Sequence, residues 1–155
     1  RVGDFDIVGP LGKGTFGVVL EGRTTNSGQW WSVKQDRVAI KTLEKKRCCR
    51  SPARTKLTLN EMKMHKLLMG TASGEHSNLV HVRDMMQSHT HVYVVMSMGA
   101  CDLTQYTNTT RKRNFLHQTR ADKEICKGVL KGLETMHSYF KAAHMDVKME
   151  NVLIK

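Results

Sequence analysis

The sequence predicts an α+β fold: a five-stranded antiparallel sheet with one helix inserted, followed by a helical segment. Up to residue 98, the chain consists mainly of short aliphatic and β-branched runs separated by turn-forming stretches. One run rich in Leu, Met and Lys, residues 57–69, interrupts them and is typical of a helix. After Gly99 the pattern changes to a helical period, with apolar residues at 125, 129, 130, 133 and 136 on one predicted face.

The individual elements follow from the local sequence. In chain order, strands are predicted at 5–11, 17–24, 30–43, 79–86 and 91–98. A polar, basic connector that contains Pro52, residues 44–56, leads into the helix at 57–69. A second helix is predicted at 121–140, and residues 142–155 close the chain as a polar loop and a short strand. The chain has no visible internal repeat, and its 155 residues are enough for one domain with a core.

The charge and the composition exclude several classes of protein. The formal net charge is +11, and eleven Lys or Arg lie between Lys34 and Lys66 against three acidic residues. Aromatic residues make up only 6% and are not interleaved with the basic ones, so nucleic-acid binding is not expected, whereas an acidic partner is. No apolar run reaches the length of a membrane span. The four cysteines form no C-x-x-C pair, which disfavours zinc and favours reduced thiols in a cytosol-like compartment.

A glycine-rich loop lies between the first two predicted strands. Gly12, Gly14, Gly17 and Val19 fit G-x-G-x-x-G-x-V. In a dinucleotide-binding fold such a loop leads from a strand into a helix, but here "VVLEG" continues as a strand. The Walker pattern G-K-[ST] is also absent, because Lys13 is followed by Gly14. The loop can close its backbone over phosphate oxygens, or it can be an ordinary tight hairpin.

A lysine in an apolar strand is the second signal. Lys41 ends the run "VAIK", and its ammonium needs an anion there. Phosphate oxygens would serve, and so would the carboxylate of Glu61, twenty residues on in the predicted helix. The alternative is a lysine that reaches solvent and a glutamate on a solvated helix face.

The third signal is the polar stretch "HMDVKMEN", residues 144–151. In its pattern H-x-D-x-K-x-x-N, Asp146 can orient and deprotonate a hydroxyl group, and Lys148 can neutralise phosphate charge. Asn151 can bind a metal ion. Taken alone, the same stretch could be a polar loop.

The three signals in this order resemble the eukaryotic protein kinase family over essentially the whole chain. Lys148 lies two residues after Asp146, and a lysine at this position resembles the serine/threonine type of protein kinase. The resemblance implies an N-lobe at 1–96 with the helix called αC, a hinge at 97–102 and the start of a helical C-lobe at 103–155. The D-F-G and A-P-E motifs of the family do not occur, so we expect the chain to be a fragment, a partial kinase domain.

The resemblance also implies ATP and Mg²⁺ as cofactors and a set of nucleotide-binding residues. These are Leu11, Gly12, Gly14, Gly17, Val19, Ala39, Lys41, Met96, Ser97, Gly99, Asp102 and Leu153. Val19 and Ala39 would cover the adenine, and Leu153 would form its floor.

The predicted hinge would bind the edge of the adenine and the ribose. Met96 would occupy the gatekeeper position, and the Ser97 carbonyl and the Gly99 amide would pair with the adenine. Asp102 would form a hydrogen bond with the ribose.

The implied catalytic residues are Asp146, Lys148, Lys41 and Glu61. Lys41 would hold the α- and β-phosphates and pair with Glu61, and Lys148 would lie beside the γ-phosphate. Asp146 would be the catalytic base, and Asn151 would hold one magnesium ion. The implied activity is ATP-dependent phosphorylation of Ser or Thr in a protein substrate.

Several departures keep an alternative open, a pseudokinase or kinase-like binding module without phosphotransfer. Met145 replaces the Arg that precedes the catalytic Asp in the family, so we expect any activity to be independent of loop phosphorylation. His65, one helical turn after Glu61, occupies a position where members of the family usually have an apolar residue. Two stretches, 24–37 and 69–78, are longer than typical kinase loops and are interpreted as surface insertions.

Overall fold

The computed structural model describes residues 1–14, 17–25, 37–69, 78–110 and 115–154. Most of the two predicted insertions, 24–37 and 69–78, lies outside these ranges, as does the start of the predicted strand at 30–43. The chain divides into two compact units, Arg1–Thr71 with Val80–Met98, and Ala72–Leu79 with Gly99–Lys155. No helix in the described ranges is both long enough and apolar enough to cross a membrane.

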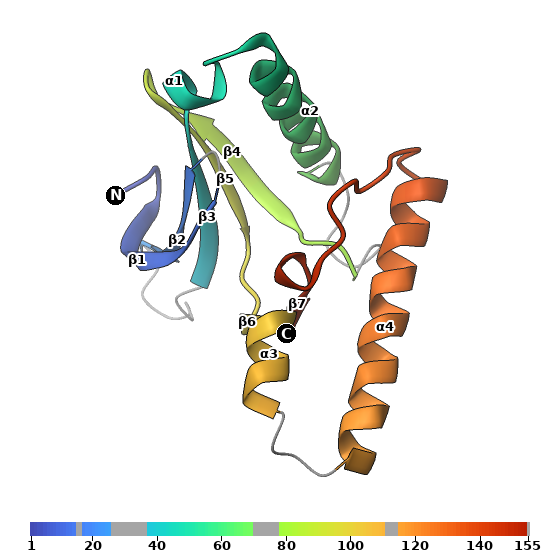
Figure 1. The fold of residues 1–155 in the computed structure, drawn as a ribbon. Coiled ribbons are helices and arrows are strands. Elements are labelled where there is room, and N and C mark those ends of the chain that lie inside the picture. The colour runs from blue at the N-terminus through green and yellow to red at the C-terminus, as the bar shows by residue number, and fades with distance from the viewer. Residues whose placement is uncertain (15–16, 26–36, 70–77, 111–114, 155) are drawn as a thin grey trace. The chain divides into compact units, whose positions relative to one another are not determined.

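The first unit contains the predicted five-stranded antiparallel sheet (Figure 1). Its strands are β1 (Phe5–Lys13), β2 (Gly17–Thr24), β3 (Arg37–Glu44), β4 (Val82–Gln87) and β5 (His91–Ser97). Their order in the sheet is β1-β2-β3-β5-β4, so β3 is central, and each pair of neighbours is antiparallel. The α+β prediction and the five strands are therefore confirmed.

The core of this unit lies on β3 and β5. Val38, Ile40 and Val95 form one fully buried cluster, and Leu43 and Val94 are also completely buried. A residue at every second position of a strand faces the same side of the sheet, so β3 places Val38 and Ile40 together. Gly22 of β2 lies against this pair, since an added Cβ would come within 2.6 Å of Ile40 Cδ1.

Two helices follow β3 in the first unit, α1 (Lys45–Cys48) and α2 (Pro52–Met69). The expectation that 44–56 is a connector without a helix was therefore wrong. Ser51 starts α2, because its Oγ accepts a hydrogen bond from the Arg54 amide at 3.4 Å and its carbonyl accepts one from the Thr55 amide at 3.0 Å. Pro52 suits the first helical position, where its missing N–H has no partner to lose.

The second unit contains a short two-stranded sheet and the later helices. β6 (Cys101–Asp102) pairs with β7 (Leu153–Ile154), and α3 (Leu103–Thr110), α4 (Phe115–Ser138) and the 3₁₀ turn η1 (Met149–Asn151) complete it. The helix predicted at 121–140 begins six residues earlier and ends two residues earlier. The predicted apolar face of this helix includes Met136, which is buried at 8% exposure as expected. It also includes Leu130, which is 67% exposed, so the prediction was wrong for that residue. Leu130 lies about 100° around the helix from residue 129, which places it outside the buried stripe.

Candidate functional site

The glycine-rich loop joins β1 to β2, as predicted, and its three glycines have different surroundings. The Gly14 amide donates a hydrogen bond to the Gly17 carbonyl at 2.9 Å, which closes the turn. A Cβ added at Gly17 would lie 1.7 Å from the backbone oxygen of Thr42, so the pairing of β2 with β3 requires glycine there. At Gly12 an added Cβ would meet nothing within 4 Å among the described residues. Packing against the described residues therefore explains Gly17 but does not explain Gly12.

Lys41 and Glu61 form an ion pair in the first unit. Lys41 lies in β3, opposite Val19 of β2 and Val94 of β5, and Glu61 lies on α2. Lys41 Nζ donates a hydrogen bond to Glu61 Oε1. The two side chains are 31% and 27% exposed, so the pair is partly screened from water. The pairing that the sequence suggested as one of several alternatives is thus present.

His65 lies one helical turn after Glu61 and is half-buried. Its Nδ1 is buried and has no hydrogen-bond partner among the described residues. Burial lowers the pKa of His65, the charge of Glu61 acts in the opposite direction, and the charge of Lys41 lowers it further. The uncharged imidazole is therefore favoured beside the ion pair.

The residues that the resemblance assigns to the adenine in the first unit lie on adjacent strands. Val19 is paired with Lys41, and Ala39 is paired with Met96 of β5. The Ser97 amide donates a hydrogen bond to the His81 carbonyl at 2.9 Å. Leu11, on β1, is 43% exposed, so its side chain is accessible to another molecule.

Gly99, Asp102 and Leu153 lie together in the second unit. Asp102 is paired with Leu153 in the small sheet, and a Cβ added at Gly99 would lie 3.0 Å from the Leu153 Cβ. Asp102 Oδ1 also accepts a hydrogen bond from the Gln105 amide at 2.8 Å, which caps α3. Asp102 therefore has a structural role at the start of α3, and its contact with the ribose stays a prediction.

The polar stretch at 144–151 forms a compact cluster around Asp146. Lys148 Nζ lies 2.9 Å from Asp146 Oδ2, and Asn151 Nδ2 donates hydrogen bonds to the Asp146 carbonyl at 2.8 Å and to Oδ2 at 2.9 Å. The hydrogen bond from Lys148 is the largest cause that lowers the pKa of Asp146, followed by the one from Asn151. The same contact raises the pKa of Lys148. Asp146 is therefore a carboxylate, and Lys148 an ammonium, at neutral pH.

The residue before Asp146 has an unfavourable conformation. Met145 has a φ of 61°, in the left-handed region that a residue with a side chain rarely adopts, and it is 90% exposed. Both the backbone and the exposed thioether raise the free energy of this segment, and such residues concentrate at functional sites.

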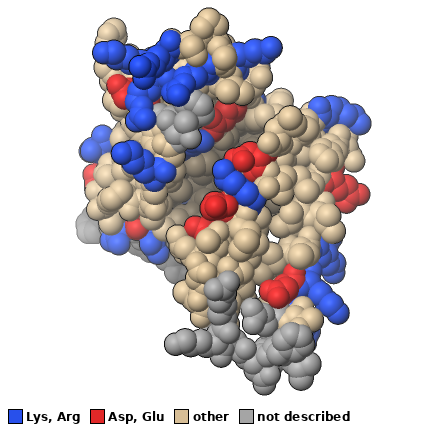
Figure 2. All heavy atoms as spheres, viewed as in Figure 1, with Lys and Arg blue, Asp and Glu red and all other residues tan. Residues whose placement is uncertain are grey.

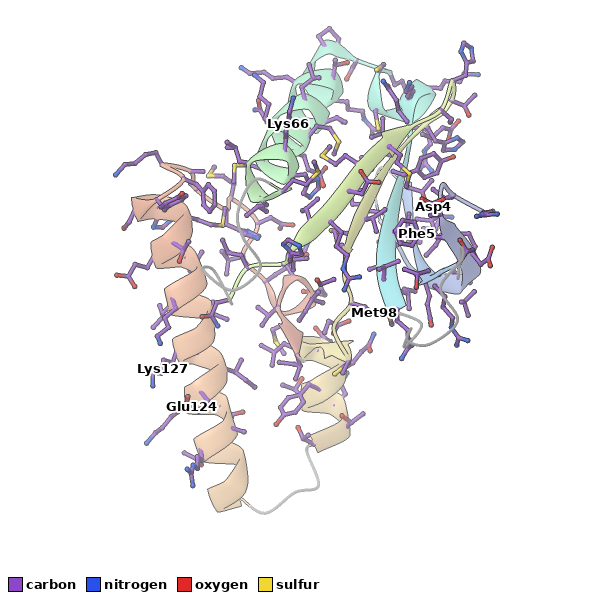
Figure 3. The ribbon with its side chains drawn as sticks, turned by 180° about the vertical axis from the view of Figure 1, so that it is seen from behind. Asp4, Phe5, Lys66, Met98, Glu124 and Lys127 are labelled. Atoms are coloured by element: carbon purple, nitrogen blue, oxygen red, sulfur yellow. The ribbon has the colours of Figure 1, made fainter. Side chains whose placement is uncertain are left out.

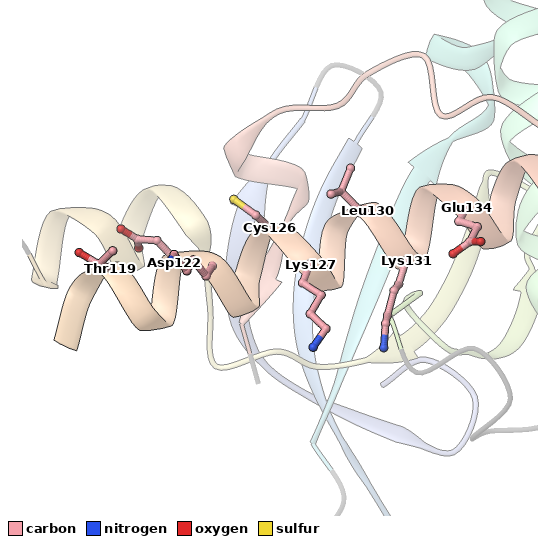
Figure 4. A pocket seen from close by; sticks show the side chains of 8 residues that line it. Thr119, Asp122, Cys126, Lys127, Leu130, Lys131 and Glu134 are labelled. Atoms are coloured by element: carbon pink, nitrogen blue, oxygen red, sulfur yellow. The ribbon is translucent and has the colours of Figure 1, made fainter. Parts of the chain in front are cut away.

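Sequence reasoning missed a shallow hollow along α4 (Figure 4). Its lining includes Thr119, Asp122, Cys126 and Leu130, which recur every three or four residues on one face of the helix. Glu124 and Lys127, labelled in Figure 3, form an ion pair at 3.9 Å on the same helix. The hollow contains none of the predicted site residues.

Residues 5–155 match the protein kinase domain family, and the chain belongs to that family. It is 29% identical over 143 residues to the serine/threonine-protein kinase ICK of Rattus norvegicus, covering 92% of this chain and 20% of the relative. It is 24% identical over 156 residues to cyclin-dependent kinase 11.2 of Caenorhabditis elegans, covering 99% and 21%. It is 26% identical over 155 residues to the serine/threonine-protein kinase PLK4 of Aedes aegypti, covering 99% and 18%. The chain spans about a fifth of the length of these relatives.

Proposed function

We propose that this chain carries the nucleotide-binding and catalytic-loop residues of an ATP-dependent kinase that phosphorylates Ser and Thr in proteins. The ion pair between Lys41 and Glu61 is the observation that carries the proposal. Lys41 lies in a strand whose residues Ile40 and Leu43 are fully buried, and Glu61 fixes its ammonium group. An ammonium has three N–H donors, and Glu61 takes one, so the others are available to the α- and β-phosphates.

The cluster around Asp146 supports the proposed transfer step. The hydroxyl oxygen of the substrate attacks the γ-phosphorus, ADP leaves, and the proton passes to the carboxylate of Asp146. Because the pKa of Asp146 is lowered, this group is ionised and can orient the hydroxyl before the attack. Lys148, held 2.9 Å from Asp146, carries the positive charge that the γ-phosphate needs. The assignment to Ser and Thr rests on the pattern D-x-K-x-x-N.

The donor groups fit the proposed Mg²⁺. Asn151 directs its amide nitrogen to Asp146, which leaves its side-chain oxygen available to another partner. Amide and carboxylate oxygens are the ligands that Mg²⁺ prefers. When bound, Mg²⁺ neutralises charge on the β- and γ-phosphates.

The lobe boundaries belong to the same proposal. We place the N-lobe at 1–96, the hinge at 97–102 and the start of the C-lobe at 103–155. The adenine contacts proposed for Val19, Ala39, Met96, Ser97, Gly99 and Leu153 rest on the resemblance to the protein kinase family.

A kinase-like binding module without phosphotransfer is the second candidate. It is favoured by the Nδ1 of His65, which is buried beside the ion pair without a partner among the described residues, and by Met145 in place of the Arg of the family. Such a module would retain the fold and bind a partner.

Phosphotransfer with a matched pair of variants separates the two candidates. The protein that carries this chain would be incubated with Mg²⁺, labelled ATP and three peptide pools that differ only in a Ser, Thr or Tyr acceptor. We expect label in the Ser and Thr pools, and a loss of roughly 100-fold in Asp146→Asn with nucleotide binding retained. Asp122→Asn, an exposed carboxylate on α4, is the control and should change neither property.

The other outcomes contradict the proposal in distinct ways. ATP binding without transfer to any pool would refute phosphotransfer and favour the binding module. Transfer to the Tyr pool alone would refute the assignment to Ser and Thr. Absence of both ATP binding and transfer would refute the proposed kinase activity and its nucleotide site, and would leave the binding module as the remaining candidate.

A further inference from the structure

A basic groove lies on the first unit, at the corner between α1 and α2. Its cations are Arg50, Lys56 and Lys63, and Pro52, Leu59 and Asn60 lie between them. In Figure 2, Lys and Arg side chains gather over α1 and the adjoining end of α2. We call the six residues the corner groove.

The outward face of α2 accounts for most of this groove. Along the helix, Thr58, Glu61 and His65 are partly covered, whereas Lys56, Leu59, Asn60 and Lys63 are exposed. The exposed residues recur at intervals of three and four, so they share one face. Lys66, labelled in Figure 3, continues that face by a further turn.

This surface has no acidic residues to balance it. Residues 45–60 include no Asp or Glu, and the one acidic residue of α2, Glu61, is paired with Lys41. Among the described residues, no carboxylate pairs with Arg50, Lys56 or Lys63. An ordinary solvated helix face alternates charges of opposite sign at i and i+4, and the corner groove does not.

The arrangement is unfavourable for the helix by itself. The first turn of α2 has no acidic residue, although the helix dipole favours negative charge there. Lys63 and Lys66 are three residues apart on the same face, where like charges destabilise a helix. An anion bound in the groove would relieve both effects, which gives this face a physical reason to bind one.

The shape and composition of the groove select the kind of anion. Leu59 is 55% exposed between the cations, and exposed Pro52 adds apolar surface. Lys56 and Lys63 are two helical turns apart, about 10 Å, which is about the span of three residues of extended peptide. None of the described residues that line the groove has an aromatic side chain on which a nucleic-acid base could stack.

We propose that the corner groove is a docking site for an acidic peptide segment of a partner protein, with carboxylates about three residues apart on either side of an apolar residue. The carboxylates bind Lys56 and Lys63, and the apolar side chain packs on Leu59. This inference does not depend on phosphotransfer, because none of the groove residues belongs to the proposed catalytic cluster.

Binding of a defined peptide to the full chain tests the proposal. The probe is a fluorescent nonapeptide of glutamates with a central leucine, and its counterpart has glutamine at every glutamate position. We expect Lys56→Glu with Lys63→Glu to weaken binding of the acidic peptide at least tenfold. The control is Lys123→Glu with Lys131→Glu on α4, which changes the net charge equally and should weaken binding less than threefold.

Three further measurements make the outcome decisive. Lys56→Gln with Lys63→Gln repeats the test with a smaller perturbation if the charge reversal impairs folding. Leu59→Ala should weaken binding of the acidic peptide and leave binding of the glutamine peptide unchanged. Equal losses in the α4 control would attribute binding to net charge and overturn the proposal. So would equal binding of the glutamine peptide, or tighter binding of a single-stranded oligonucleotide that competes for the same lysines.

Discussion

The glycine-rich loop allows ligand binding and folding to be separated by single methyl groups. Gly9, Gly12 and Gly17 lie on β1 and β2, and none has a φ in the left-handed region. Alanine is therefore compatible with the backbone at all three positions, and only the surroundings decide its effect. A Cβ added at Gly9 or Gly12 would contact none of the described residues, whereas at Gly17 it would overlap Thr42.

The magnitudes follow from these distances. In Gly17→Ala the new Cβ starts 1.7 Å from the Thr42 oxygen and 2.8 Å from its carbonyl carbon, both backbone atoms of the paired strand. Since a methyl carbon keeps about 3 Å or more from such atoms, β2 and β3 must separate, and we expect a loss of about 3 kcal/mol in the free energy of unfolding. Gly12→Ala and Gly9→Ala should leave it unchanged or raise it by up to about 1 kcal/mol, because alanine restricts the unfolded chain.

Nucleotide binding should order the same variants differently. If ATP phosphates lie against Gly12, the added methyl group overlaps them and weakens Mg²⁺-ATP binding at least about tenfold. Gly9→Ala, on the same strand but outside the loop, should bind normally. Urea denaturation gives the free energies, and isothermal titration calorimetry gives the affinities. Equal affinities for Gly9→Ala and Gly12→Ala would refute the placement of the nucleotide, and an undiminished stability of Gly17→Ala would refute the packing argument.

Three further predictions concern stability. Burial lowers the pKa of His65, so as the pH falls the unfolded chain takes up a proton near pH 6.5, before the folded chain does. The free energy of unfolding should therefore decrease as the pH drops from about 7.5 to about 5.5. Urea denaturation measures this dependence, and His65→Leu should flatten it. Ile40→Ala empties part of a fully buried site and should cost about 2–5 kcal/mol by the same measurement, and a loss below about 1 kcal/mol would argue against that core. Gly132→Ala places a Cβ 2.9 Å from the Asn78 carbonyl oxygen and should lower the melting temperature, whereas Glu134→Ala, exposed on the same helix, should leave it nearly unchanged.

Local patterns in the sequence were sufficient to predict the sheet. The runs around Val38, Ile40 and Val94 have the β-branched composition of buried strands, and they are buried. The pairing of Lys41 with Glu61 could be suggested because each residue stood in a recognisable element. The choice between that pair and two solvated charges needed the relative placement of β3 and α2, which no local pattern encodes.

The sequence was less informative where one residue type fits two different local structures. The start of α2 was missed because Ser51 and Pro52 also read as turn residues, and only the hydrogen bonds from Arg54 and Thr55 identify a helix cap. Similarly, the glycine motif gave no reason to treat Gly17 differently from Gly12. That distinction depends on the distance to Thr42, a residue 25 positions away on another strand.

The most direct test of the central claim, that Lys41 binds the phosphates of ATP, uses a biotin-carrying acyl phosphate of ATP. A lysine amine close to the bound phosphates attacks the acyl carbon and displaces ATP, leaving an amide on that lysine, which mass spectrometry locates. We predict rapid labelling of Lys41 that excess Mg²⁺-ATP suppresses, while exposed lysines such as Lys56 and Lys127 are labelled slowly and without competition. Labelling of Lys41 at the same rate as those lysines, unaffected by ATP, would contradict the claim.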